Sequence, residues 1–401
     1  MTQDLSASLG LGPGGDGSAV DRPNGRPDGP AGGQLGDARH GGEPLPGQGG
    51  GGGGGQKVGD PDRSQRGGKR RDRGGDVSMV PPAEFTSYYG HNIVKPSPWE
   101  HDIPAYLFAG GVAAGSSLLA AGGDLTGRPA LRRTGRLGAV VALAFSMLAL
   151  VHDLGKPSRF YNMLRTVKVT SPMSVGTWIL SAYGPFAGLA AVAELAGMLP
   201  AGVAQGRLAR AMRLVRVLDR PAGVVAALTA PPVAAYTAVL LADTATPSWH
   251  SAYKELPFVF VGSAAAASGG LGMIGAPVAQ AGPARRLAAG GAVLELVAER
   301  VMERTMGITA EPLHHDEAGR FMRAATVLTA GGAVGTLLAG RSRTAAVLSG
   351  AALLAGSACT RFGVFEAGQA SARDPKYTVV PQRERLEREG PVRHVEKEPR
   401  A

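Results

Sequence analysis

The sequence is poor in the side chains on which disulfide frameworks and protein-held metal clusters depend. Cys359 is its only cysteine, which excludes a disulfide framework and an iron–sulfur cluster ligated by thiolates of this chain. No pair of histidines lies inside the apolar segments to ligate haem iron, because only His152 comes near one and it lies at the segment's end. Residues 1–20 lack the apolar core of a signal peptide, so we expect none.

Signatures of nucleotide binding and of hydrolysis are missing as well. The glycine run at residues 49–55 lacks the Lys-Ser/Thr ending of a phosphate-binding loop and is not preceded by a strand pattern. No serine, histidine and aspartate occur at the spacing of a catalytic triad. The sequence therefore predicts neither a nucleophile nor a redox centre on this chain.

Large apolar side chains are scarce in the first part of the chain. Residues 1–95 are rich in Gly, Pro and Arg, and such a segment cannot bury enough apolar surface to offset the entropy lost on ordering, so we expect disorder. A basic cluster at residues 69–73 suits contact with anionic lipid or a partner subunit, although a solvated linker is the simpler interpretation. The formal net charge is +10, but loop and tail arginines of a membrane protein explain it without a nucleic-acid partner.

From residue 103 the sequence turns apolar. Residues 103–123 contain no charge and would measure roughly 31 Å as a helix, enough to cross the hydrocarbon core of a bilayer. The hydropathy pattern predicts eight spans, at residues 103–123, 137–151, 171–193, 221–242, 256–284, 287–301, 324–340 and 344–360. The sixth is interrupted by Glu295 and Glu299, so seven spans are the alternative if this helix lies in the membrane interface. We thus predict an all-α, multi-pass membrane bundle over residues 96–362, followed by a polar tail over residues 363–401.

The two ends of this bundle differ in charge. We name the end at which the first span begins side A and the opposite end side B. The predicted side B loops are rich in arginine and contain Asp124 and Asp219 as their acids. The positive-inside rule then places side B in the cytoplasm and both tails outside the cell membrane.

Titratable and aromatic side chains fall on side A. The histidines lie there or in the tails, and Trp99 and Trp249 lie on the same side. Asp102, Asp153 and Asp243 join them at the ends of spans. This bias favours a proton-handling site at side A, and plain interfacial anchoring is the alternative for any single residue.

Two polar features lie within the spans themselves. Tyr236 and Asp243 are seven residues apart and so share one helix face, with a phenol suited to donate a hydrogen bond to a carbonyl group. Glu295, Glu299 and Glu303 follow an i, i+4, i+8 pattern that also forms one stripe. Carboxylates at membrane depth usually face a polar path, which makes Glu295 a candidate proton relay; pairing with a neighbouring arginine is the alternative.

Three motifs resemble a known family. They are WEHDIPAYLFAGGVAAG at residues 99–115, HDLGKPSRF with SPMSVGTW at residues 152–160 and 171–178, and YTAVLLADTATPSW at residues 236–249. In this order they resemble the NrfD family, the membrane subunits of polysulfide reductases, over roughly residues 97–370.

The resemblance implies a haem-free anchor that reacts with menaquinone or ubiquinone. It implies a ferredoxin-like iron–sulfur subunit and a molybdopterin catalytic subunit as partners, as in a formate dehydrogenase or a polysulfide reductase. It assigns the quinone headgroup to Tyr236 and to His101 or Asp102. We add Asp153, Asp243, His152 and, more weakly, Glu295 as proton-transfer residues. The alternatives are a secondary transporter or proton channel that uses the same carboxylates, and a purely structural anchor.

Overall fold

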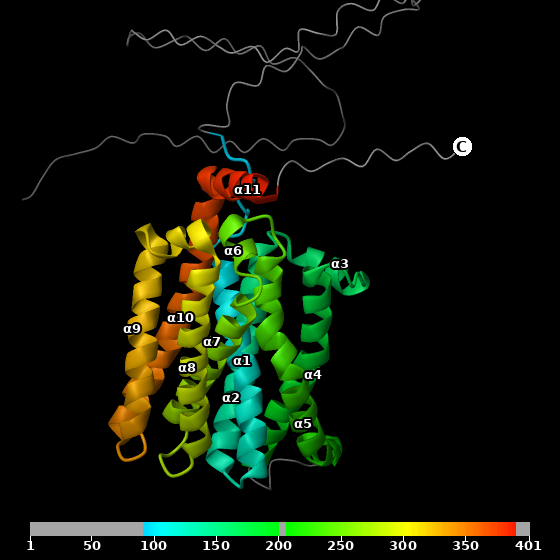
Figure 1. The fold of residues 1–401 in the computed structure, drawn as a ribbon. Coiled ribbons are helices and arrows are strands. Elements are labelled where there is room, and N and C mark those ends of the chain that lie inside the picture. The colour runs from blue at the N-terminus through cyan, green and yellow to red at the C-terminus, as the bar shows by residue number, and fades with distance from the viewer. Residues whose placement is uncertain (1–90, 200–205, 390–401) are drawn as a thin grey trace, which may run out of the picture. The chain divides into compact units, whose positions relative to one another are not determined.

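The computed structural model describes residues 91–199 and 206–389, and all regular secondary structure in these ranges is helical. Eight long helices lie side by side as a bundle (Figure 1): α1 (Asp102–Leu125), α2 (Pro129–Asp153), α4 (Pro172–Met198), α5 (Gly206–Ala242), α7 (Leu256–Gly275), α8 (Gly282–Thr305), α9 (Asp316–Leu338) and α10 (Arg343–Arg373). The short elements η1 (Pro157–Arg159), α3 (Phe160–Arg165), α6 (Pro247–Ser251), η2 (Gly307–Leu313) and α11 (Lys376–Glu389) lie at side A. The predicted tail at residues 1–95 lies largely outside the described residues.

Seven of the long helices are long and apolar enough to cross a membrane, and α8 is the exception. Its charged side chains lower its hydropathy, yet it packs along α7 and beside α9 over the length of the bundle (Figure 1). The prediction of an all-α, multi-pass membrane bundle is confirmed. The described residues therefore contain seven apolar spans, and α8 is a more polar eighth helix packed among them.

Several predicted span limits need correction. The span predicted at residues 256–284 ends at Gly275, because Pro277 disfavours helical backbone at Ala276, whose ψ is 148°. Pro283 then occupies the first turn of α8, where its missing N–H costs nothing. At the other end of the chain, α10 runs past residue 362 to Arg373 and is followed by α11.

Close backbone contact explains how α8 is held in the bundle. A Cβ at Gly262 of α7 would lie 2.6 Å from the backbone nitrogen of Glu295, and one at Gly269 would lie 2.5 Å from that of Ala288. A real side chain cannot come so near, so glycine is required at both positions. Because of this close contact, the face of α8 that carries the glutamates is covered by neighbouring helices and does not face lipid.

The buried core differs between the two halves of the bundle. Toward side A it is aromatic, with Tyr106, Tyr183, Tyr236, Trp249 and Phe365 in one connected cluster. Toward side B it consists almost entirely of Ala and Leu. Side chains able to donate hydrogen bonds or bind a ring are thus concentrated in the side A half.

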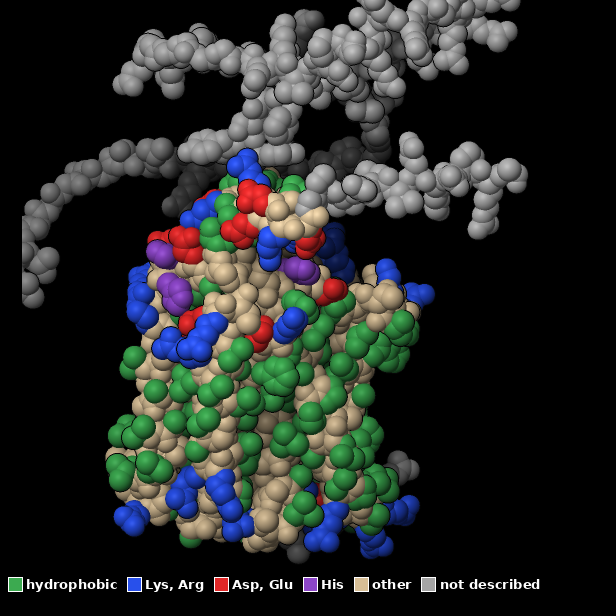
Figure 2. Space-filling model, in the orientation of Figure 1, with side chains coloured by type: hydrophobic (Ala, Val, Ile, Leu, Met, Phe, Trp, Pro, Cys, Tyr) green, Lys and Arg blue, Asp and Glu red, His purple; other side chains and the backbone are tan. Residues whose placement is uncertain are grey.

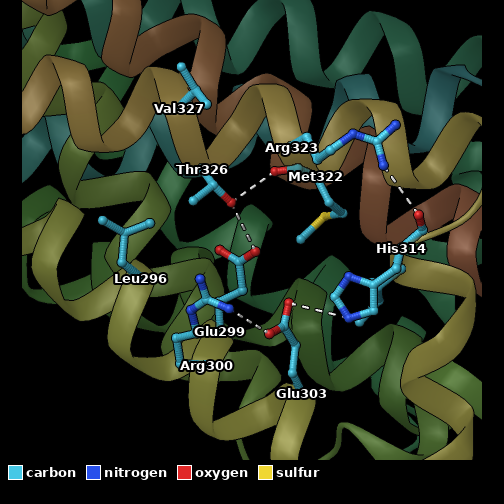
Figure 3. Close-up of a pocket in the computed structure, with 10 residues that line it drawn as sticks. Leu296, Glu299, Arg300, Glu303, His314, Met322, Arg323, Thr326 and Val327 are labelled. Atoms are coloured by element: carbon cyan, nitrogen blue, oxygen red, sulfur yellow. Dashed lines mark hydrogen bonds and ion pairs between the residues drawn. The ribbon is translucent and has the colours of Figure 1, made fainter.

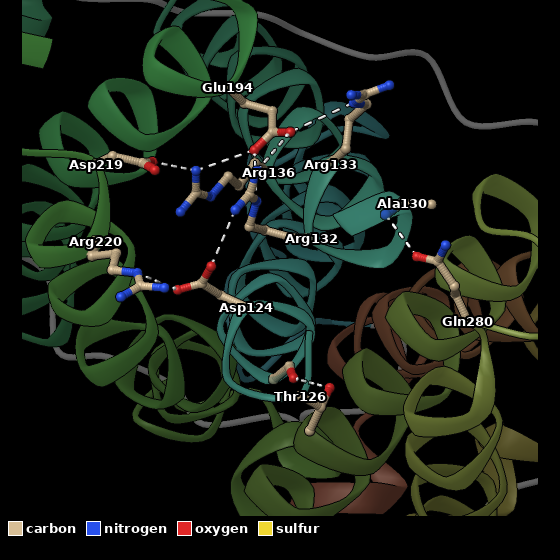
Figure 4. A network of polar contacts seen from close by, with 11 residues as sticks. Asp124, Thr126, Ala130, Arg132, Arg133, Arg136, Glu194, Asp219, Arg220 and Gln280 are labelled. Atoms are coloured by element: carbon tan, nitrogen blue, oxygen red, sulfur yellow. Dashed lines mark hydrogen bonds and ion pairs between the residues drawn. The ribbon is translucent and has the colours of Figure 1, made fainter. Parts of the chain in front are cut away.

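A buried ionic network ties four helices together at side B (Figure 4). Arg136 of α2 and Glu194 of α4 are each 4% exposed and lie 3.2 Å apart. Glu194 also accepts a hydrogen bond from Arg132, which bonds Asp124 of α1, and Arg136 pairs with Asp219 of α5. Charges taken out of water need such partners, so the network fixes the side B ends of α1, α2, α4 and α5 relative to one another.

Replacing Glu194 by Ala should destabilise the bundle by about 3 kcal/mol, because it leaves the buried Arg136 with a single partner. The measurement is thermal unfolding of the purified protein in detergent. Glu387→Ala, which removes an exposed carboxylate from α11, is the matched control and should change little. Equal melting temperatures for the two variants would show that the network carries no stability.

Candidate functional site

Two buried tyrosines meet in the side A half of the bundle. Tyr106 of α1 and Tyr236 of α5 are 3% and 8% exposed, and their hydroxyl groups are hydrogen-bonded to each other. The ring of Tyr236 lies directly against Gly176 of α4, where a side chain would collide with it. The hydroxyl of Ser146 donates to the backbone carbonyl of Tyr106 at 3.1 Å. We call Tyr106 and Tyr236 the tyrosine pair.

A cavity of about 190 Å³ lies in the side A half of the bundle, and neither tyrosine of the pair is among its lining residues. It lies between α2 and α4 and is lined by Leu143, Met147, Leu150, Phe160, Thr177, Leu180, Ser181 and Gly184. Thr177 follows the glycine that touches Tyr236, and Met147 follows the serine that bonds Tyr106. An apolar cavity of roughly 150 Å³ can hold benzene, so this cavity has room for one substituted six-membered ring.

Above the tyrosine pair, titratable side chains hold the start of α1 to its neighbours. The carboxylate of Asp102 lies 2.6 Å from His152 Nδ1 at the end of α2, and His101 lies 3.4 Å from Glu366 of α10. Asp153 is half-buried beside His152. We call these five residues the side A rim. Asp102 lies one helical turn, about 6 Å, from Tyr106, on the same face of α1.

Asp243 does not belong to this arrangement. It lies exposed in the turn after α5, about two helical turns from Tyr236. Its backbone N–H still bonds the carbonyl of Val239, as in a helix, but its side chain is not buried with the tyrosine pair. Tyr236 and Asp243 therefore do not lie in one buried site, although their spacing places them on the same side of the helix.

The glutamates of α8 form a second polar feature, and Figure 3 shows two of them, Glu299 and Glu303, between α8 and α9. Glu295 is 1% exposed; its Oε1 accepts a hydrogen bond from Thr360 at 2.6 Å, while its Oε2 has no partner among the described residues. Glu299 is 5% exposed and accepts from Thr326, and Glu303 lies 3.4 Å from Arg300 and 3.8 Å from His314. We call these three glutamates the glutamate stripe.

The stripe runs from the middle of the bundle to a cavity that opens at side A. This cavity measures about 460 Å³ and is lined by Glu299, Glu303, His314 and Arg323, among others. Among the described residues no arginine lies within 4.0 Å of the Glu295 carboxylate, and Arg300 pairs with Glu303. The buried Arg361 of α10 is nevertheless near enough to Glu295 to interact with it electrostatically.

Arg361 of α10 lies between the two features. It is fully buried; its Nη2 donates to the carbonyl of Phe260 at 2.8 Å, and its guanidinium carbon stands 3.7 Å above the centre of the Phe260 ring. A Cβ at Gly111 of α1 would lie 3.4 Å from the same Nη2. Its Nε and Nη1 find no partner in the described part of the chain.

Residues 91–289 match the family described as "Polysulphide reductase, NrfD". The chain is an NrfD-family membrane subunit. A comparison with the curated proteins finds no match. The family match contains all three sequence motifs and both tyrosines, whereas the glutamate stripe, α9 and Arg361 lie beyond its end.

In this NrfD-family subunit, the sequence singled out Tyr236 and the rim residues His101, Asp102, His152 and Asp153 as candidates, but it did not single out Tyr106, which contacts Tyr236. The spacing of the first motif could have indicated Tyr106, because it lies one helical turn after Asp102. Across the described ranges, no group of three or more His, Cys, Asp or Glu side chains is arranged to hold a metal ion. The arrangement offers phenolic hydroxyls, a ring-sized apolar cavity and a rim of titratable groups.

Replacing either Tyr106 or Tyr236 by Phe should destabilise the protein by about 1 kcal/mol, because the remaining hydroxyl is left buried without its partner. The double variant should be no less stable than either single one, since both hydroxyls are then absent. Unfolding of the four proteins in mixed micelles measures this coupling. Additive losses would mean that the two hydroxyls do not interact.

Proposed function

We propose that this NrfD-family subunit exchanges electrons and protons with a membrane quinone, without haem, as the anchor of a molybdopterin and iron–sulfur oxidoreductase. The observation that supports the proposal is the buried tyrosine pair beneath the side A rim. A ring-sized apolar cavity lies in the same half of the bundle and is lined by the residues that follow Gly176 and Ser146, which contact the pair. Its partners would be a ferredoxin-like iron–sulfur subunit, docked at side A, and a molybdopterin catalytic subunit. The family supports this assembly by analogy.

The residues present suit a quinone headgroup. Its reduction takes up two electrons and two protons and converts two carbonyl groups to hydroxyls. The hydroxyl of Tyr236 would turn from Tyr106 to donate a hydrogen bond to one carbonyl oxygen, and the apolar side chains of the cavity would enclose the ring. The single ring of ubiquinone matches the cavity volume, whereas the fused second ring of menaquinone would need room beyond it.

The side A rim would supply and remove the protons. Asp102 and His152 are already joined by a hydrogen bond, so a proton could pass directly between them. Asp102 lies one turn, about 6 Å, above Tyr106, so transfer to the tyrosine pair would need a bridging water molecule or the quinone itself. His101 would help to hold the headgroup end of α1, and Asp153 would accept protons beside His152. Asp243, exposed at the end of α5, would act at the surface as an acceptor from solvent.

Glu295 would serve a separate proton route. Its free carboxylate oxygen and the adjacent Glu299 lead toward the cavity at side A, and a chain of such groups is how protons move at membrane depth. The same observation favours the second candidate function, a proton channel or transporter with no redox partner. Proton uptake by liposomes containing the subunit alone, in the absence of quinol, would distinguish this candidate.

Tyr236→Phe should slow quinol oxidation about tenfold or more, the equivalent of one lost hydrogen bond to the reacting group. The complex is purified in mild detergent, its subunits and bound quinone are identified by mass spectrometry, and the rate is followed with a dye as electron acceptor. Subunit composition should not change.

The matched control is Tyr183→Phe, which removes another fully buried hydroxyl, bonded to Ser117 and to the carbonyl of Ala113. It should leave the rate within about twofold. If the assembled Tyr236→Phe complex turned over at an unchanged rate, Tyr236 would not be the hydrogen-bond donor to the quinone headgroup. Recovery of the subunit without an oxidoreductase partner or quinone, after controls for dissociation, would favour the channel.

Glu295→Gln should slow proton-coupled turnover while the complex still assembles. Glutamine can accept the hydrogen bond from Thr360 but cannot carry a proton, so the packing is kept and the relay is lost. The measurement is the pH change that accompanies quinol oxidation in proteoliposomes. Glu303→Gln, at the exposed end of the stripe, should have a smaller effect because solvent can replace it; identical profiles for Glu295→Gln and the parent protein would exclude the relay.

A further inference from the structure

The first part of α5 extends beyond what is needed to cross a membrane. α5 has 37 residues, and residues 221–242 alone measure roughly 33 Å, more than the roughly 30 Å of a hydrocarbon core. Asp219 and Arg220 pair with Arg136 and Asp124, which lie at the side B ends of α2 and α1. Residues 206–220 therefore lie at the side B surface and not in the hydrocarbon. Pro221, which cannot donate a helical hydrogen bond, marks the boundary between the two parts.

This surface segment has a stripe of exposed apolar side chains. Leu214, Val217 and Leu218 are 61%, 69% and 37% exposed, and their i, i+3, i+4 spacing places them on one side of the helix. Met212 and Asp219 face the bundle from another side. Apolar side chains in a row at the end of a membrane bundle are suited to the acyl chains just below the headgroups.

A basic stripe runs next to the apolar one. Arg213, Arg216 and Arg220 follow an i, i+3, i+7 spacing and are exposed. Within the described ranges, no acidic side chain lies within 4.0 Å of Arg213 or Arg216, whereas Arg220 lies 3.6 Å from Asp124. Figure 2 shows Lys and Arg side chains at both ends of the bundle, whereas His, Asp and Glu side chains gather mainly at the end opposite to this one.

We propose that residues 206–220 form an interfacial binding site for an anionic phospholipid. In this site the acyl chains contact Leu214, Val217 and Leu218. The phosphate is bound by Arg213 and Arg216. Arg220 lies between the lipid and Asp124. The ion pairs of Asp219 and Arg220 fix the segment to α1 and α2, so that both stripes are presented together. Charge complementarity selects an anionic over a zwitterionic headgroup, and the adjoining apolar stripe selects a lipid over a free anion.

The test is a titration of the full chain, in detergent, with phosphatidylglycerol or phosphatidylcholine, read by native mass spectrometry. The parent protein should bind phosphatidylglycerol more tightly than phosphatidylcholine. Arg213→Gln/Arg216→Gln should weaken phosphatidylglycerol binding roughly tenfold or more and leave phosphatidylcholine binding unchanged. Arg286→Gln/Arg341→Gln removes the same charge from exposed positions elsewhere at side B, at the start of α8 and in the turn before α10, and is the matched control.

The apolar stripe is tested separately with Leu214→Ser/Val217→Ser, which should also weaken phosphatidylglycerol binding although no charge is lost. An equal loss in the two arginine double variants, or a loss in neither, would overturn the site, because binding would then depend on overall charge or not on this helix at all. Displacement of the lipid by millimolar inorganic phosphate, with no effect of Leu214→Ser/Val217→Ser, would identify a site for free anions and overturn the lipid proposal.

Discussion

The close contact between α7 and α8 is the interaction on which the rest of the bundle depends. A helix with three glutamates along one face has no stable position in lipid, where water cannot satisfy charged side chains. Gly262 and Gly269 let the two backbones approach until that face is covered by protein. Glu295 then meets Thr360 of α10, and α10 in turn is positioned to place Arg361 against Phe260 of α7. The polar interior follows from packing of the smallest side chains.

Arg361 connects this interior to α1. Its guanidinium lies over the Phe260 ring and reaches Gly111, little more than one helical turn from Tyr106. A buried guanidinium with two nitrogens that have no partner in the described part of the chain is costly unless water or a ligand group satisfies it. In the described part of the chain, polar atoms of Glu295 and Thr329 in the same region also have no hydrogen-bond partner.

The sequence predicted the features that depend on one helix at a time. Uninterrupted apolar stretches located the spans, and the motifs around His101 and Tyr236 located the family. It did not predict contacts between residues that are far apart in the chain. Tyr106 and Tyr236 are 130 residues apart, so no local pattern could show that their hydroxyls meet, and Asp243 was linked to Tyr236 by helical spacing although the helix ends before it.

The direction in which the polar features open helps to decide between a quinone-reactive anchor and a transporter. A transporter exposes its site to each side of the membrane in turn, and polar groups are therefore needed along both halves of the path. Here the tyrosine pair leads to the side A rim, and the glutamate stripe leads to a cavity at the same end. In the side B half of the described bundle the buried charged residues are Arg136 and Glu194, and they are engaged with each other. Proton exchange at one surface is sufficient for a quinone-reactive subunit whose electrons come from a partner docked on that surface, and so the arrangement favours the anchor.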